Sequence, residues 1–308
     1  MKVLHTSDWH LGARLGRHER LPDQQAALRG LIDLAEDVRP DLVLHTGDVF
    51  DSSRPPYEAL QLGVHALARL ASVAPTVVVC GNHDSPQLLN VIHHLAGMAE
   101  PRRLWAVTQP DVLTVPGLDG VALACVPFIP LTAVADLASD EPSQFEGTYA
   151  DGIRHLNDRL LDQATDQAGR HGAVLYAAHL HVHGARPGRS ERRITVGEDY
   201  ATHVEGLHRA MYAALGHIHD PQLLPGGTVT GRYAGSLVPL DFGEATQQKQ
   251  ALVVEIDAGD VTVHEHPLNV GRPLQPFDGT VEELESLAAD GGLDGHILKA
   301  RVHSEDPV

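Results

Sequence analysis

The sequence contains five short clusters of aspartate, asparagine and histidine, the residue types that hold divalent metal ions in proteins. They are SDWH at 7–10, TGD at 46–48, GNHD at 81–84, HLH at 179–181 and GHIH at 216–219. All the ligand atoms are oxygen or nitrogen, which suits Mn²⁺, Fe or Zn²⁺ rather than a soft metal or an iron–sulfur cluster. Each cluster alone is a short pattern that a chain with 21 histidines can contain by chance. Five of them in order are informative.

The clusters supply more ligands than one ion needs. The candidate metal ligands at these strand ends are Asp8, His10, Asp48, Asn82, His83, Asp84, His179, His217 and His219. Seven ligands that include one shared carboxylate fit two ions about 3.5–4 Å apart. His181 lies on the same strand face as His179 by alternation, so it is the alternative ligand there.

Hydrophobic patterning places each cluster at the end of a predicted strand. Strands are predicted at 2–6, 41–48, 76–84, 172–182 and 211–219. Helices predicted at 24–38 and 57–73 separate the first three strands, which favours a parallel sheet. Ligands of such sheets bind beyond the carboxyl ends of the strands, where these clusters lie.

The remainder of the chain predicts more α/β structure and then a new unit. A strand at 121–128 and a helix at 150–168 continue the first pattern, and 231–236 and 250–268 resemble antiparallel strands. After Gly271 the pattern restarts. Thr280 and Glu283 form a capping-box signature for a helix at 280–289, and a strand follows at 296–303.

Composition limits the class of protein. The net charge of −18 argues against nucleic-acid binding by the whole surface, but the charge is uneven. Residues 1–103 hold 10 basic and 12 acidic side chains, and the other 205 hold 13 and 29. No membrane-spanning run or signal peptide is expected. Cys80 and Cys125 lie in apolar runs, which predicts buried, reduced thiols and a cytoplasmic location.

The ordered clusters resemble the calcineurin-like metallophosphoesterase superfamily. Within it, SDWHLG (7–12), GDVFDSSRPP (47–56), GNHDS (81–85) and GHIHDPQ (216–222) are similar to the SbcD nuclease family, the bacterial counterpart of the nuclease subunit in the double-strand-break repair complex. The resemblance implies an α/β two-sheet sandwich flanked by helices at 1–268. Residues 269–308 then fit the start of the family's small α+β capping domain. Family members continue into helices that dock on an ATPase, and this sequence ends at HSEDPV.

The resemblance also implies an activity and a role for each residue. The activity is two-metal hydrolysis of phosphodiester bonds at DNA ends and hairpins, as exonuclease and endonuclease, in DNA repair and recombination. Mn²⁺ is the expected metal, with Zn²⁺, Fe or Mg²⁺ as alternatives, and the expected partners are an SbcC-like ATPase and a second copy of the chain.

Asp8, His10 and His219 match the ligands of one ion, and Asn82, His179 and His217 match those of the other. Asp48 is the expected bridge between them. His83 is expected to stabilise the transition state and protonate the leaving oxygen, and Asp51 and Asp84 are expected to orient the ligands.

Basic residues near the clusters are candidate contacts to the DNA backbone. They are Arg14, Arg17, Arg20, Arg54 and, in RPGRSERR at 186–193, Arg189 and Arg192. Trp9 is expected to be a packed wall rather than a stacking platform. A small-substrate phosphodiesterase and a metal-stabilised DNA-binding scaffold are the alternative functions.

Overall fold

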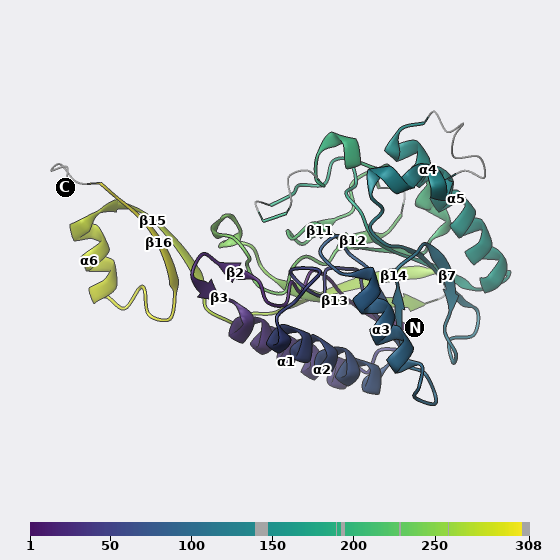
Figure 1. Cartoon of the computed structure of the whole chain (residues 1–308), viewed down its shortest axis with the longest axis horizontal. Helices are drawn as coiled ribbons and strands as arrows, with labels where there is room; N and C mark the ends of the chain where they lie inside the picture. The colour runs from purple at the N-terminus through teal and green to yellow at the C-terminus, as the bar shows by residue number, and fades with distance from the viewer. Residues whose placement is uncertain (139–146, 189, 192–194, 228, 258, 304–308) are drawn as a thin grey trace.

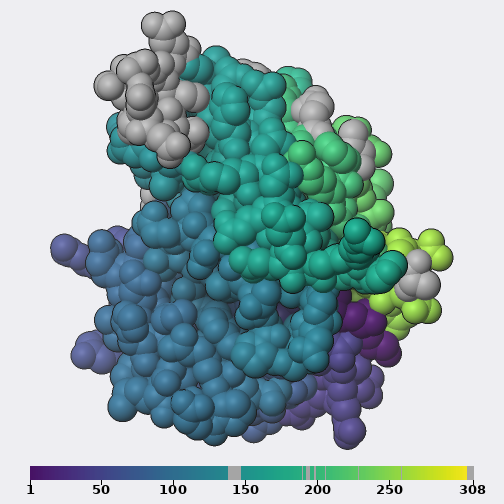
Figure 2. Space-filling view, turned by 90° about the vertical axis from the view of Figure 1, so that its right-hand side faces the viewer, coloured from purple at the N-terminus to yellow at the C-terminus, as the bar shows by residue number. Residues whose placement is uncertain are grey.

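The computed structural model of the chain describes residues 1–138, 147–188, 190–191, 195–227, 229–257 and 259–303. Two six-stranded sheets face each other, and helices cover their outer faces (Figure 1). This arrangement confirms the predicted two-sheet α/β sandwich. Figure 2 views the molecule from another side, with residues from the first third of the chain below and residues of the teal segment above.

The first sheet has the strand order β14-β13-β1-β4-β5-β6. Its strands are β1 (Lys2–Thr6), β4 (Leu42–His45), β5 (Thr76–Val79), β6 (Leu104–Val107), β13 (Gln250–Asp257) and β14 (Asp260–Pro267). β1, β4, β5 and β6 are parallel, and β13 joins β1 antiparallel. The apolar stripes of α1 (Leu21–Val38), α2 (Tyr57–Val73) and α3 (Pro86–Ala96) pack on its outer face. The two helices predicted in this region are confirmed.

The second sheet has the order β11-β12-β10-β9-β8-β7. Its strands are β7 (Asp111–Thr114), β8 (Val121–Val126), β9 (Ala173–His179), β10 (Tyr212–Gly216), β11 (Gln222–Leu223) and β12 (Gly231–Tyr233). The helix α5 (Tyr149–Ala168), which begins on a capping box at Thr148 and Asp151, covers its outer face.

The expected antiparallel strands at 231–236 and 250–268 are present, but they lie in different sheets. β13 and β14 do form an antiparallel hairpin, but β12 belongs to the other sheet. The chain reverses through β11 before it reaches β12, so β12 pairs antiparallel with β11 and parallel with β10.

The core between the two sheets is almost entirely apolar. Val3, Leu44 and Val79 of the first sheet belong to one buried cluster with Leu123 and Ala177 of the second. The main polar link across it is His5, whose Nδ1 lies 2.9 Å from the Tyr212 hydroxyl and whose Nε2 lies 3.0 Å from Thr46 Oγ1. Cys80 and Cys125 are buried free thiols, as expected.

A small separate unit follows the sandwich and lies at the left of Figure 1. It consists of β15 (Leu274–Thr280), α6 (Val281–Ala289) and β16 (Ile297–His303), with the two strands parallel. The predicted capping box between Thr280 and Glu283 is confirmed. The Arg272 guanidinium pairs with Asp23 at 2.8 Å, and Lys299 Nζ lies 5.5 Å from the centre of the Phe242 ring. These contacts tie the unit to the sandwich.

The remaining elements are short. They are β2 (Arg14–Leu15), β3 (His18–Glu19), α4 (Val134–Ala138) and the 3₁₀ turns η1 (Leu131–Ala133), η3 (Glu198–Tyr200), η4 (Glu205–Arg209) and η5 (Phe242–Glu244).

Candidate metal centre

Backbone strain is concentrated where β1, β4 and β10 end. Among the described non-glycine residues, five have a positive φ, and four of them are candidate ligands: Asp8 (50°), His10 (46°), Asp48 (56°) and His217 (94°). Such conformations cost about 1–3 kcal/mol each and persist where the surrounding structure imposes them. The strain turns these side chains away from the strand direction and toward one another.

Two glycines make room for this convergence. A β-carbon at Gly47 would collide with the His179 ring, and one at Gly81 would collide with the Asp48 carboxylate. Gly47 also has a φ of 101°, a conformation that side chains rarely adopt. The glycine in T-G-D and the first residue of G-N-H-D are therefore required by the packing of the site itself.

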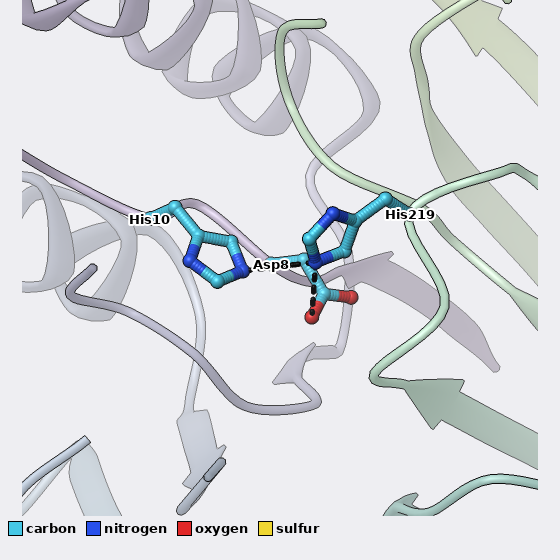
Figure 3. A group of neighbouring side chains, drawn as sticks. All are labelled: Asp8, His10 and His219. Carbon is cyan, nitrogen blue, oxygen red and sulfur yellow. Dashed lines mark hydrogen bonds and ion pairs between the residues drawn. The ribbon is translucent and has the colours of Figure 1, made fainter. Parts of the chain in front are cut away.

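One group of ligand atoms comprises Asp8, His10 and His219 (Figure 3). His10 Nε2 and His219 Nε2 point at each other across 3.0 Å, and Asp8 Oδ1 lies 4.0 Å from His219 Nε2. Asp48 Oδ2 lies 3.5 Å from His10 Nε2. All four side chains are almost fully buried.

A second group lies on the other side of Asp48. Asn82 Oδ1 is 2.8 Å from both His179 Nε2 and His217 Nδ1, and these two nitrogens are 3.2 Å apart. Asp48 Oδ2 lies 3.4 Å from His179 Nε2. One carboxylate oxygen therefore stands between the two groups, where the sequence predicted a bridge. His179, rather than the alternative His181, belongs to the group that contains Asp48.

The outer nitrogens of the histidines are already engaged. His179 Nδ1 donates to Thr46 O at 2.8 Å, His217 Nε2 donates to Thr195 O at 3.0 Å, and His10 Nδ1 donates to Asp51 Oδ1 at 3.2 Å. A neutral imidazole carries one N–H, so its inward nitrogen presents a lone pair. Two lone pairs that face each other at about 3 Å repel, and a cation or a proton between them removes the repulsion.

The spacing of the inward atoms fits such cations. Metal–ligand bonds of about 2.1 Å that meet at right angles place ligand atoms about 3.0 Å apart. The closest inward pairs, between 2.8 and 3.2 Å, match that spacing. The donor set therefore fits divalent metal ions.

The electrostatics agree with an anionic centre that attracts positive charge. Burial alone would lower the pKa of His10 and of His179, but the neighbouring carboxylates raise each to about 9. Burial opposes ionisation of Asp48 too, yet the surrounding histidines, His179 foremost, hold its pKa well below its usual range. In contrast, burial and the neighbouring His179 lower the pKa of His217 far below its usual value.

The remaining predicted residues border this centre. His83 is half-buried, its backbone N–H donates to Asp48 Oδ1 at 2.7 Å, and its Nδ1 lies 2.7 Å from Asp51 O. Its ring meets that of His10 edge-on at 4.7 Å. The Asp84 carboxylate accepts hydrogen bonds from the backbone of Gly81, Val49 and Phe50. Asp84 thus ties the loop after β4 to the loop after β5.

Several neighbours of the site were not predicted from the sequence. Behind His219 lie Ser190, Glu191, Glu244 and Lys249. No short motif marks them, because they come from irregular segments far apart in the chain. Ser190 and Glu191 lie within the arginine-rich stretch at 186–193, for which the sequence predicted only contacts to the DNA backbone at Arg189 and Arg192.

The basic candidates separate into three groups. Arg14, Arg17 and Arg54 are exposed, and Arg14 pairs with Glu19 at 2.8 Å. The expectation for Arg20 is wrong, because its side chain is 1% exposed, pairs with Asp23 at 3.3 Å and donates to Arg272 O. Arg189 and Arg192 lie outside the described residues. Trp9 is fully buried against His45, as expected.

Comparison with known proteins gives the family. Residues 1–221 match the calcineurin-like phosphoesterase family. The SbcD subunit of the nuclease SbcCD from Bacillus subtilis is 32% identical over 89% of this chain and 71% of its own length. This chain belongs to the SbcD nuclease family of calcineurin-like phosphoesterases. The SbcD subunit from Staphylococcus epidermidis is 28% identical over 92% of this chain and 74% of its own length.

Solved structures agree on the fold. A dimetal phosphatase from Danio rerio superposes with a TM-score of 0.52 at 14% identity, over 87% of this chain and 96% of the other. Its membership of the SbcD nuclease family makes the chain a metal-dependent phosphoesterase, as its sequence predicted, and does not favour the small-substrate alternative. Within the described residues, no helix combines the length and apolar character needed to cross a membrane.

Proposed function

We propose that this protein is a DNA nuclease that uses two divalent ions, most readily Mn²⁺. Asp8, His10 and His219 would hold one ion, and Asn82, His179 and His217 would hold the other. Asp48 would contribute to both sites. The observation that carries the proposal is the convergence of lone pairs on two adjacent points on either side of Asp48.

When bound, the two ions supply Lewis acidity toward a phosphodiester and toward the attacking water. The chain's own residues orient the reacting groups. Asp51, Thr46 and Thr195 fix the ring orientation of three histidines through their outer nitrogens. Because these hydrogen bonds exist without substrate, the ligands need no rearrangement when the substrate binds.

His83 delivers the proton. Its Nδ1–H donates to Asp51 O, which leaves Nε2 as the nitrogen that exchanges a proton with the departing sugar oxygen. Asn82 and the acid–base residue His83 are half-buried, whereas the six remaining proposed ligands are buried. Substrate therefore reaches the site from the side of Asn82 and His83. No serine or cysteine nucleophile takes part.

DNA and an SbcC-like ATPase are proposed as partners because both relatives are named as the SbcD component of the nuclease SbcCD. Cleavage of DNA ends and hairpins in repair and recombination, a homodimer and a cytoplasmic location complete the proposal. Arg14 on β2, Arg17 in the turn between β2 and β3, and Arg54 in the loop after β4 are exposed and would contact the DNA backbone.

The test compares two substrates. Purified protein is incubated with an end-labelled DNA duplex and with bis-p-nitrophenyl phosphate, each in Mn²⁺, in Mg²⁺ and in chelator. Manganese-dependent DNA cleavage that stops in chelator supports the proposal. Hydrolysis of the small diester beside intact DNA contradicts it in favour of a small-substrate enzyme, and no hydrolysis of either substrate favours the scaffold.

A further inference from the structure

Behind His219 lies a buried charged cluster that the proposed reaction does not use. Glu244 is fully buried on η5, and Lys249 is 3% exposed where the chain enters β13. We propose that Glu244, acting through the Ser190 hydroxyl, is the positioning residue that sets the ring orientation of His219. This inference rests on the metal centre proposed above.

Two successive hydrogen bonds connect His219 to Glu244 through Ser190. The Ser190 hydroxyl lies 2.5 Å from His219 Nδ1 and also bonds Glu244 Oε1. Glu244 Oε1 lies 3.6 Å from His219 Nδ1. The His219 Nδ1–H therefore donates to Ser190, and the Ser190 hydroxyl donates to Glu244. This arrangement leaves a lone pair on His219 Nε2, the atom that faces His10.

The other carboxylate oxygen is held as firmly. Glu244 Oε2 accepts from Lys249 Nζ at 2.9 Å and from the Leu240 N–H at 3.0 Å. The ion pair with Lys249 keeps a negative charge behind His219 that would otherwise be costly to bury.

The backbone of His219 is fixed by the same cluster. Its N–H donates to Glu191 Oε1 at 2.9 Å, and its carbonyl accepts from Lys249 Nζ at 2.9 Å. With the backbone held at both ends, the remaining freedom of His219 is rotation of its side chain. Ser190 and Glu244 are the polar side chains positioned to restrict that rotation. A carboxylate behind a metal-binding histidine both orients the ring and raises its basicity.

The test measures metal binding rather than turnover. Chelator-stripped protein is titrated with Mn²⁺ by calorimetry as wild type, Glu244→Gln, Glu244→Asp and Ser190→Ala. Glu244→Gln keeps the shape and an acceptor oxygen but removes the charge. The control is Glu265→Gln, which makes the same chemical change in an exposed pair with Arg232. Unfolding temperatures in chelator report any general loss of stability.

We expect wild type and Glu265→Gln to bind two ions. Glu244→Gln should weaken one ion by about 10–100-fold and leave the other unchanged, because outer carboxylates contribute that much to affinity. Glu244→Asp should recover part of the loss, and Ser190→Ala should weaken the same ion.

Two results overturn the inference alone: two wild-type affinities in both Glu244→Gln and Ser190→Ala, or equal weakening of both ions with a lower unfolding temperature in chelator. A wild type that binds no ion overturns the proposed function and this inference together.

Discussion

The two sheets bring different chemistry to the same site. Loops after β1, β4 and β5 of the first sheet supply the proposed carboxylate ligands and the amide oxygen, together with His10 and His83. The end of β9 and the loop after β10 in the second sheet supply only imidazole ligands, those of His179, His217 and His219. Each proposed ion takes ligands from both sheets. The first sheet thus provides negative charge, and the second provides neutral nitrogen ligands.

This division means that neither sheet can form the site alone. Separated from the second sheet, Asp8 and Asp48 would repel each other without enough ligands for a tight site. Separated from the first, three histidines would carry no charge to attract a cation. The interface between the sheets is therefore as important to the metal centre as the ligands are, and it is held by an apolar core and by polar links such as that of His5.

The largest expected effect comes from the shared carboxylate of the first sheet. Asp48→Asn removes the charge that both ions share, so phosphodiesterase activity should fall by at least about 10³-fold, since the ions contribute several kcal/mol to the transition state. Added Mn²⁺ should not restore it. Steady-state hydrolysis over a Mn²⁺ series measures this, with Asp33→Asn on the exposed face of α1 as control. Recovery at high Mn²⁺ would show that the charge is not shared.

The second-largest effect is expected at His83 in the first sheet, where metal binding and proton transfer can be measured separately. His83→Ala should lower hydrolysis by about 10²–10⁴-fold while both ions still bind, because an acid–base residue contributes that much without holding metal. Calorimetric Mn²⁺ titration beside kinetics tests this, with exposed His171→Ala as control. His83 also lies within ligand distance of His10 and Asp48. Loss of one ion in the variant would make His83 a ligand instead.

The sequence predicts the residues of this site that lie close together along the chain better than those that only the fold brings together. Asp8 and His10, Asn82 and His83, and His217 and His219 were found because short motifs at strand ends keep a fixed spacing. Their strand periodicity was also strong enough to place them on one edge of the fold.

Residues that depend on long-range contacts were not found. Arg20 looked like a surface cation, but its ion pair with Asp23 and its bond to Arg272, 252 residues away, bury it. Glu244 reaches His219 only because η5 folds back behind β10, and nothing in its neighbours marks that. The sequence does not indicate the sheet to which β12 belongs for the same reason, since three residues carry too little pattern to choose a partner.

A smaller effect is expected from the second sheet. His217→Ala removes a neutral ligand and no charge, so we expect one ion to bind more weakly by at least the roughly 10–100-fold that loss of a residue behind a ligand costs, and activity to return as Mn²⁺ is raised. The Mn²⁺ dependence of hydrolysis, compared directly with that of Asp48→Asn, measures the contrast between the sheets. If His217→Ala is as inactive as Asp48→Asn at saturating Mn²⁺, then charge does not distinguish the ligands of the first sheet from those of the second.

The smallest effect is expected at His5, which links the two sheets, and it changes how the free energy of unfolding depends on pH. Burial lowers the pKa of His5 from 6.5 to about 3. Between these values the unfolded chain binds a proton that the folded chain does not. The stability that His5 contributes is therefore complete above pH 6.5 and is lost as the pH falls toward 3, by about 1.4 kcal/mol per pH unit.

His5→Gln keeps a polar side chain between Tyr212 and Thr46 but cannot titrate, so its free energy of unfolding should depend less steeply on pH. Urea unfolding in chelator at pH 7.5, 6 and 5 measures the difference in slope, with His264→Gln on exposed β14 as control. His45, whose pKa burial also lowers to about 3, is present in every variant, so its contribution cancels in the comparison. Equal slopes in wild type and His5→Gln would mean that His5 is protonated between the sheets. The polar link would then be a buried charge, and the core that holds the two halves of the site together would be less apolar than its packing indicates.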